Sequence, residues 1–156
     1  RMALSTVNRE GTSFTLIDDS FNANPDSMKA GLNGLKAWNS NDGKEPFRVA
    51  LLGAMLELGA DETALHTSIG TYADELGIDA IIAVGSAQDQ HLDALAQALA
   101  DGARQSQSAS VDCVHDIDAA EQLVIDLARN HPDAVVLLKG SHASGLSALA
   151  ERWAKN

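Results

Sequence analysis

Four polar side chains directly follow an apolar run near the start of the chain, in the stretch LIDDSFNANPDSM. Asp18, Asp19, Asn22 and Asn24 all precede Pro25, a residue that suits the first position of a helix. Turn formation alone favours Asn, Asp, Ser and Pro. The carboxyl end of a strand in an open α/β sheet is, however, also the place where ligands bind. Four such side chains together favour a ligand-recognition loop over a simple turn.

A second candidate lies in the stretch LLKGSHASG, where Lys139 ends an apolar run. A lysine in this position must either extend to solvent or meet an anion. Gly140 and Ser141 allow backbone amides to point outward, which favours recognition of an anion such as a carboxylate. A third stretch, LGAMLELGADE, contains Glu57. For Glu57, a solvated surface carboxylate and a ligand-binding one remain equally open.

Several chemical signatures are missing from the sequence. It contains no G-x-x-x-x-G-K-[ST] phosphate loop, no G-x-G-x-x-G after the first parallel strand and no G-x-S-x-G nucleophile motif. No two histidines have the spacing of a metal-binding pair. We therefore expect no metal site and no catalytic residue within this chain. The scattered histidines are His66, His91, His115, His131 and His142.

The elements that position these loops alternate along the chain. A turn at Glu10-Gly11 predicts an opening hairpin of two strands. Short apolar runs predict buried parallel strands. Asn24 is a good N-cap for a helix that begins at Pro25. The predicted parallel strands after the hairpin span residues 47–55, 79–86, 110–116 and 133–141.

Apolar residues at helical spacing predict the intervening helices. Asp61 is expected to start one helix and Gly77 to end it, while Asp118 and Glu121 resemble a capping box for a later one. The predicted inner faces are Met28, Leu32 and Leu35; Leu65, Ile69, Tyr72 and Leu76; Leu92, Leu95 and Leu99; Leu123, Val124 and Leu127; and Leu146, Leu149, Ala150 and Trp153.

This alternation predicts a single α/β domain over residues 1–156. The expected fold is Rossmann-like and doubly wound, with a mostly parallel sheet of about six strands. The opening hairpin would supply the one antiparallel strand.

Composition excludes several classes of partner. A formal charge of −11 disfavours nucleic acid and anionic membrane surfaces. The single cysteine, Cys113, cannot form an internal disulfide and is expected to be a buried structural thiol, which fits a cytoplasmic setting. No apolar run approaches the roughly 20 residues that span a bilayer. The first residue is Arg1 rather than Met, which suggests a piece of a longer chain.

Three stretches, in this order and at this spacing, resemble the C-terminal domain of the Mur ligases: IDDSFNANPDSM, LGAMLELGADETALHTSIGTYADELG and VLLKGSHASGL. The resemblance covers nearly the whole chain. Its NANPDS loop is similar to that of the family members that join D-alanyl-D-alanine to UDP-N-acetylmuramoyl-tripeptide in peptidoglycan synthesis.

The resemblance implies a cytoplasmic, three-domain, ATP-dependent ligase. In such an enzyme the first domain holds the UDP-sugar peptide, and the central domain holds ATP, magnesium ions and a carbamylated lysine. The C-terminal domain closes over the central domain, touches the nucleotide and supplies the site for the incoming dipeptide. It follows that this domain alone holds neither ATP nor Mg and is inactive by itself.

The resemblance also assigns roles to residues near the nucleotide. Asp19 matches an aspartate that hydrogen-bonds the ATP ribose, and Arg1 matches a linker arginine that contacts the nucleotide. Asn22 and Asn24 stand in the loop that approaches the adenine. Phe21 departs from the family pattern, because tyrosine is usual there.

Other matches lie near the incoming substrate. Lys139, Gly140, Ser141 and His142 match a KGSR-like segment that lines the dipeptide pocket. His142 replaces the usual arginine, and a neutral imidazole cannot act as a bidentate cation. Ala54 stands where the family's GDM form has aspartate.

A second reading from another class remains open, namely a stand-alone α/β binding or regulatory module such as a receiver. Asp18 and Asp19 after a strand resemble acidic phosphoacceptor sites. A receiver also needs an aspartate at the end of a central strand, and the LLGAM strand has none. A G-K-[ST] segment encoded upstream would decide for the ligase.

Overall fold

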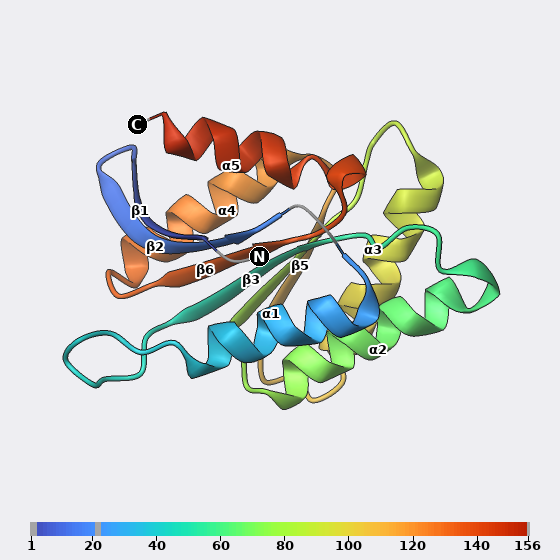
Figure 1. The fold of residues 1–156 in the computed structure, drawn as a ribbon, viewed down its shortest axis with the longest axis horizontal. Helices are drawn as coiled ribbons and strands as arrows, with labels where there is room; N and C mark the ends of the chain where they lie inside the picture. Colours follow the sequence, from blue (N-terminus) through green and yellow to red (C-terminus); the bar gives the residue numbers. More distant parts are fainter. Residues whose placement is uncertain (1–2, 21–22, 156) are drawn as a thin grey trace.

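The computed structural model describes residues 3–20 and 23–155, which form one six-stranded sheet with helices on both faces (Figure 1). The strand order is β1-β2-β6-β3-β4-β5. Only the β1/β2 pair is antiparallel among these neighbours. The predicted fold class is thereby confirmed. The strands are β1 (Ala3–Arg9), β2 (Thr12–Asp19), β3 (Arg48–Gly53), β4 (Ala80–Val84), β5 (Ser110–Val114) and β6 (Val135–Lys139).

Three helices cover one face of the sheet and two cover the other, as Figure 1 shows. The first layer contains α1 (Pro25–Ala37), α2 (Glu62–Glu75) and α3 (Gln90–Ala103), and the second contains α4 (Ile117–Asn130) and α5 (Leu146–Ala154). Every residue of β3, β4 and β6 is buried, as expected for parallel strands covered on both faces.

Local sequence explains how the hairpin and the first helix form. Glu10 and Gly11 have φ angles of 50° and 77°, as a tight hairpin turn requires, and Val7 pairs with Phe14 across it. Asn24 caps α1 as predicted: its Oδ1 accepts a hydrogen bond from the Ser27 N–H at 2.8 Å. The Ser27 Oγ accepts one from the Asn24 N–H at 3.0 Å, which completes a capping box.

A buried arginine fixes the other end of α1. The Arg48 side chain donates from Nε to the Leu35 carbonyl at 3.0 Å and from Nη2 to the Trp38 carbonyl at 2.8 Å. These carbonyls lie in the last turn of α1 and at its C-cap, where the regular i to i+4 bonds end; the Leu35 carbonyl also accepts the Trp38 N–H at 3.3 Å. Arg48 therefore joins the C-terminus of α1 to the first residue of β3.

The capping box predicted at Asp118 and Glu121 is wrong. Asp116 is the N-cap of α4, and its Oδ1 accepts a hydrogen bond from the Ala119 N–H at 2.8 Å. Glu121 is instead buried and accepts hydrogen bonds from Trp153 Nε1 at 2.7 Å and Arg152 at 2.9 Å. Burial raises the pKa of Glu121, but these bonds and nearby Arg9 outweigh it, so the pKa lies below its usual value. The carboxylate thus joins α4 to α5.

The predicted inner face of α2 is only partly correct. Ile69 is fully buried, but Leu65, Tyr72 and Leu76 are half-buried and pack at the margin of the core. The reason is the close contact between α2 and α3 at two glycines. A Cβ atom added at Gly70 would lie 1.9 Å from the Leu99 carbonyl oxygen.

The second glycine of this contact is Gly102, where an added Cβ would lie 2.0 Å from the Thr67 carbonyl oxygen. Alanine has a helix propensity about 1 kcal/mol better than glycine, but here the two backbones would have to separate. We expect Gly102→Ala to lower the free energy of unfolding by about 1–3 kcal/mol, measured by urea denaturation. Gln97→Ala, on the exposed face of the same helix, is the control. An unchanged or higher stability of Gly102→Ala would contradict this packing.

Candidate functional site at the carboxyl edge of the sheet

The C-terminal ends of β2, β6 and β3 lie side by side, with β6 in the middle. The chain leaves β2 and β3 towards α1 and α2 on one face, whereas it leaves β6 towards α5 on the other. A change of direction between neighbouring strands makes the switch point at which α/β sheets bind ligands. The fold therefore brings the two predicted loops, after β2 and after β6, to the same edge.

A buried ion pair joins these two strand ends. Asp19 and Lys139 are partners in the β2/β6 register, and Lys139 Nζ lies 2.8 Å from Asp19 Oδ2. Their side chains are 7% and 2% exposed. The pair lies against α1 at Gly31, where an added Cβ would be 3.4 Å from Lys139 Cδ. The bare backbone at Gly31 therefore leaves room for the lysine side chain.

The sequence left open whether Lys139 extends to solvent or meets an anion, and the ion pair decides between the two. The lysine does not extend to solvent, and the anion it meets is Asp19. An ammonium has three donors and a carboxylate has about four acceptor positions, so this contact alone does not exhaust either group. The roles of Asp19 and Lys139 towards nucleotide and dipeptide stay predictions.

The backbones of β3 and β6 approach closely just beyond the pair. A Cβ atom at Gly53 would lie 2.4 Å from Ser144 Cβ, and one at Gly140 would lie 2.9 Å from Gly53 Cα. Ser141 donates its N–H to the Ala54 carbonyl at 3.1 Å. Its Oγ atom is buried and has no hydrogen-bond partner within the described part of the chain. This hydroxyl is therefore available to a ligand or to a rearranged loop.

The remaining predicted site residues differ in how the structure places them. Asn24 is exposed, and its Oδ1 is engaged in the cap of α1. His142 is exposed at the start of the 3₁₀ turn His142–Ser144, with its Nδ1 3.3 Å from Ser147 Oγ. Arg1 and Asn22 lie outside the described residues, as does Phe21.

Glu57 and the buried Ala54 belong to the loop that follows β3. Glu57 is exposed and has a φ of 61°, an uncommon conformation for a residue other than glycine. The question of whether it binds a ligand stays open.

A buried histidine anchors this loop, and sequence reasoning did not find it. His66 of α2 is fully buried, and its Nδ1 lies 2.7 Å from the Glu62 carbonyl oxygen. This contact assigns the proton to Nδ1, because Nε2 accepts a hydrogen bond from the Met55 N–H at 2.9 Å. Desolvation lowers the pKa of His66 below its usual 6.5. The only sequence signal was a histidine one position from the predicted apolar face of its helix.

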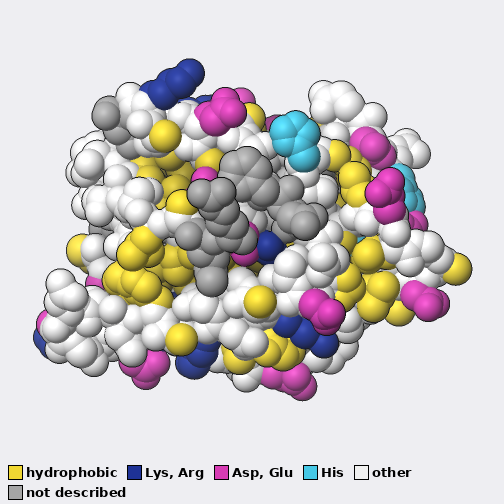
Figure 2. All heavy atoms as spheres, viewed as in Figure 1, with side chains coloured by type: hydrophobic (Ala, Val, Ile, Leu, Met, Phe, Trp, Pro, Cys, Tyr) yellow, Lys and Arg dark blue, Asp and Glu magenta, His cyan; other side chains and the backbone are white. Residues whose placement is uncertain are grey.

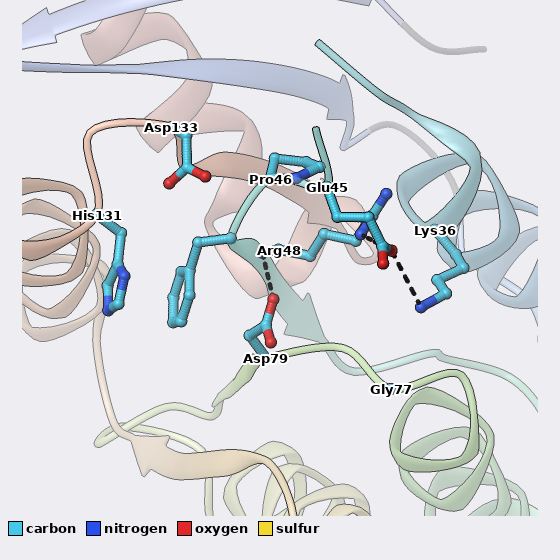
Figure 3. Close-up of a pocket in the computed structure, with 9 residues that line it drawn as sticks. Lys36, Glu45, Pro46, Arg48, Gly77, Asp79, His131 and Asp133 are labelled. Carbon is cyan, nitrogen blue, oxygen red and sulfur yellow. Dashed lines mark hydrogen bonds and ion pairs between the residues drawn. The ribbon is translucent and has the colours of Figure 1, made fainter. Parts of the chain in front are cut away.

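The polar hollow shown in Figure 3 lies at the opposite edge of the sheet. Its volume is about 390 Å³. Arg48 donates its backbone N–H to Asp79 at 2.8 Å, and its guanidinium binds Glu45. The ring of Phe47 stacks on His131 with centroids 3.7 Å apart. The hollow lies at the amino ends of the parallel strands, whereas ligands of α/β sheets bind outside the carboxyl ends, so the switch point is the stronger candidate site.

Charged side chains are scattered over the surface of the domain. On the face in Figure 2, acidic side chains lie at several separate places around the rim, with basic ones between them. Within residues 3–20 and 23–155, no group of three or more His, Cys, Asp or Glu side chains is arranged to hold a metal ion. None of the helices described is both long and apolar enough to cross a membrane.

The sheet order and the two loops at its switch point define a class of protein. A family model described as "Mur ligase, glutamate ligase domain" matches residues 1–142, and the chain belongs to this family. The chain is 38% identical over 151 residues to the UDP-N-acetylmuramoyl-tripeptide--D-alanyl-D-alanine ligase of Mycobacterium tuberculosis (strain CDC 1551 / Oshkosh). This match covers 93% of this chain and 29% of that relative. The enzyme of the same name from Escherichia coli (strain K12) is 40% identical over 70 residues, or 45% of this chain and 14% of the relative.

Solved structures show the same fold. A crystal structure of MurF from Acinetobacter baumannii superposes with a TM-score of 0.72 at 25% identity, over 98% of this chain and 30% of that one. MurF from Thermotoga maritima in complex with ADP gives a TM-score of 0.62 at 21% identity, over 96% of this chain and 30% of that one, a likeness of fold alone. The chain thus spans less than a third of the length of these relatives.

The His66 anchor makes stability depend on pH. The pKa of His66 is lower in the folded state than in the unfolded state. The contribution of the neutral imidazole to the free energy of unfolding is therefore complete above the unfolded pKa of about 6.5, and it is lost as the pH falls towards the folded pKa. His66→Leu also leaves the buried Met55 N–H without its acceptor. We expect it to lower the free energy of unfolding by about 1–3 kcal/mol at pH 8. Between pH 7 and pH 5, the free energy of unfolding of His66→Leu should fall by less than that of the unaltered protein.

Denaturation at a series of pH values measures both effects. His142→Gln, which replaces an exposed histidine, is the control. A pH profile of His66→Leu parallel to that of the unaltered protein would show that His66 does not titrate as described.

Proposed function

We propose that this domain is the C-terminal part of an ATP-dependent ligase that joins D-alanyl-D-alanine to UDP-N-acetylmuramoyl-tripeptide in the cytoplasm. The observation that carries the proposal is the 38% identity, over 93% of this chain, to a ligase of that name. The meeting of the two predicted loops at the switch point supports it. The preceding domains would hold the UDP-linked tripeptide, ATP and magnesium.

The residues at the edge suit contact with a nucleotide that is held mainly elsewhere. The sequence has no phosphate loop, and the described residues contain no metal-binding cluster. Asp19 nevertheless places a carboxylate at the strand end, and a carboxylate has about four acceptor positions. We assign to Asp19 hydrogen bonds from the ribose hydroxyls. Arg1, Asn22 and Asn24 would stand around the rest of the nucleoside.

The groups that follow β6 suit the carboxylate of an incoming dipeptide. Lys139 carries the positive charge, and Ser141 has a buried hydroxyl that lacks a partner within the described residues. Gly140 allows the close approach of β6 to β3 that holds Ser141 in place. His142 lies next to these groups in the chain and is exposed. Together they would hold the dipeptide while its amine is presented to the reaction.

The contribution of this domain to catalysis would be positioning. ATP would transfer its γ-phosphoryl group to the tripeptide carboxylate, giving an acyl phosphate and ADP. The dipeptide ammonium would then lose a proton, and the free amine would attack the acyl carbonyl and form the amide as inorganic phosphate leaves. Fixing the amine next to the acyl group replaces a bimolecular encounter by a nearly unimolecular step, which can supply about 7–11 kcal/mol when the alignment is good. The residues of this chain would hold the amine-bearing substrate and the nucleoside at one edge of the sheet.

The ion pair allows a structural role to be separated from a binding role. Removing one partner of a buried pair typically costs about 3–5 kcal/mol, whereas replacing both with uncharged groups is often neutral. We therefore expect Asp19→Asn and Lys139→Met each to destabilise the full-length enzyme. The double variant should recover most of the stability, yet its KM values for ATP and for D-alanyl-D-alanine should both rise about tenfold or more.

Thermal denaturation and steady-state kinetics with each substrate varied in turn would measure these effects. The control is the exposed pair Asp126 and Arg129, 3.7 Å apart, changed to Asn and Met. Normal KM values in the stable Asp19→Asn/Lys139→Met double variant would show that the pair is structural only.

A further inference from the structure

A small groove lies on the α5 side of the same sheet edge, opposite the ion pair. It has a volume of about 160 Å³ and opens at the C-terminal end of β2. Ligand pockets for drug-sized molecules measure about 300–1,000 Å³. The groove is therefore suited to a small group and not to a nucleotide. Its lining residues are Asp18, Ser20, Ser147, Ala150, Glu151 and Ala154.

Strand alternation explains why Asp18 and Ser20 face this groove. Phe14 and Leu16 of β2 pack in the core beneath α4 and α5, whereas Ile17 packs beneath α1. Successive side chains of a strand point to opposite faces. Asp18 and Ser20 therefore continue the α5 side, while Asp19 points to α1 and Lys139.

Within the described part of the chain, the groove contains one buried hydroxyl without a hydrogen-bond partner and two carboxylates without an ion-pair partner. Ser20 is fully buried, and its Oγ has no hydrogen-bond partner among the described residues. Buried hydroxyls are nearly always hydrogen-bonded, so an unpartnered one calls for an explanation. The Asp18 Oδ1 accepts a hydrogen bond from the Ser20 N–H at 3.1 Å, which fixes its carboxylate over the groove. Across the described chain, neither Asp18 nor Glu151 has an ion-pair partner.

This combination defines the chemistry of the missing partner. Two carboxylates without a counter-ion attract a positive charge, and a buried hydroxyl offers one further hydrogen bond. The methyl groups of Ala150 and Ala154 line the same side of α5 and suit a short aliphatic portion. A small organic cation with an ammonium or guanidinium head satisfies all of these groups at once.

We propose that the groove formed by Asp18, Ser20 and Glu151 is a subsite for such a cationic head group, with the ammonium of the incoming dipeptide as its occupant. This inference rests on the proposed function, because it takes the dipeptide to arrive at this edge. The sequence places Ser20 and Gly140 one residue beyond the paired Asp19 and Lys139, so the two ends of the dipeptide would be held at neighbouring strand ends. A Lys or Arg side chain from another part of the full-length chain is the alternative source of the same charge.

Ser20→Ala and Glu151→Gln in the full-length enzyme test the subsite. A purely structural Ser20 would make the alanine variant equally or more stable and kinetically unchanged, because it removes a buried hydroxyl without a partner. If the groove binds the dipeptide ammonium, we expect the KM for D-alanyl-D-alanine to rise about tenfold in each variant, while the KM for ATP stays unchanged. Ser110→Ala and Glu75→Gln, both exposed and away from the groove, are the matched controls.

A second measurement identifies the source of the charge. N-acetyl-D-alanyl-D-alanine lacks the ammonium, so it should fail to compete with the dipeptide if the ammonium is what the groove binds. A lower melting temperature of both variants with unchanged KM values would instead assign the groove to a cationic side chain of the protein. Unchanged KM values together with unchanged or higher melting temperatures would overturn the subsite. If the unaltered enzyme ligates no D-alanyl-D-alanine, the proposed function fails independently of the groove.

Discussion

The contact between Asp19 and Lys139 is a constraint on which the whole carboxyl edge depends. Two opposite charges 2.8 Å apart lie in a region where both side chains are almost completely buried. Desolvation offsets much of their attraction, so the pair adds little net stability. Removing either charge alone is nevertheless strongly destabilising, because it leaves the other one buried without compensation. Because each residue ends a strand, the pair fixes the end of β2 against the end of β6. The loops that leave these two strands are the ones that carry the predicted binding residues.

The sheet order gives this edge two different faces. On the α1 side, the ion pair lies against Gly31, and on the α5 side Asp18 and Ser20 line an acidic groove. At the ends of β3 and β6, a side chain at Gly53 would collide with the Ser144 side chain, and one at Gly140 would collide with the backbone of Gly53. The edge therefore carries charged groups on both faces of the sheet, which under the proposal would hold the two ends of a zwitterionic substrate.

Apolar patterns were enough to predict the helices and the parallel strands, and the turn at Glu10-Gly11 was enough to predict the antiparallel hairpin, because each depends on local sequence. Lys139 shows the limit of that approach. Its position after an apolar run predicted an anion partner, but the sequence pattern did not identify which one. The partner is Asp19, which lies 120 positions away in the chain and is brought close because β2 and β6 are neighbours in the sheet. The packing of α4 against α5 brings Glu121 to Trp153, whereas Asp116 caps α4. A serine after two aspartates, such as Ser20, is typical of turns and carries no signal of a site. Its burial without a hydrogen-bond partner among the described residues is visible only in the structure.

The central claim is that the carboxyl edge around β2 and β6 is the substrate-binding surface of this domain. Hydrogen–deuterium exchange of the full-length enzyme, free and with a non-hydrolysable ATP analogue and D-alanyl-D-alanine, tests it most directly. We predict slower exchange in peptides that cover residues 17–24 and 138–147, with no change around residues 45–48 and 131–134 at the opposite edge. Protection confined to the opposite edge, or none in this domain, would contradict the account.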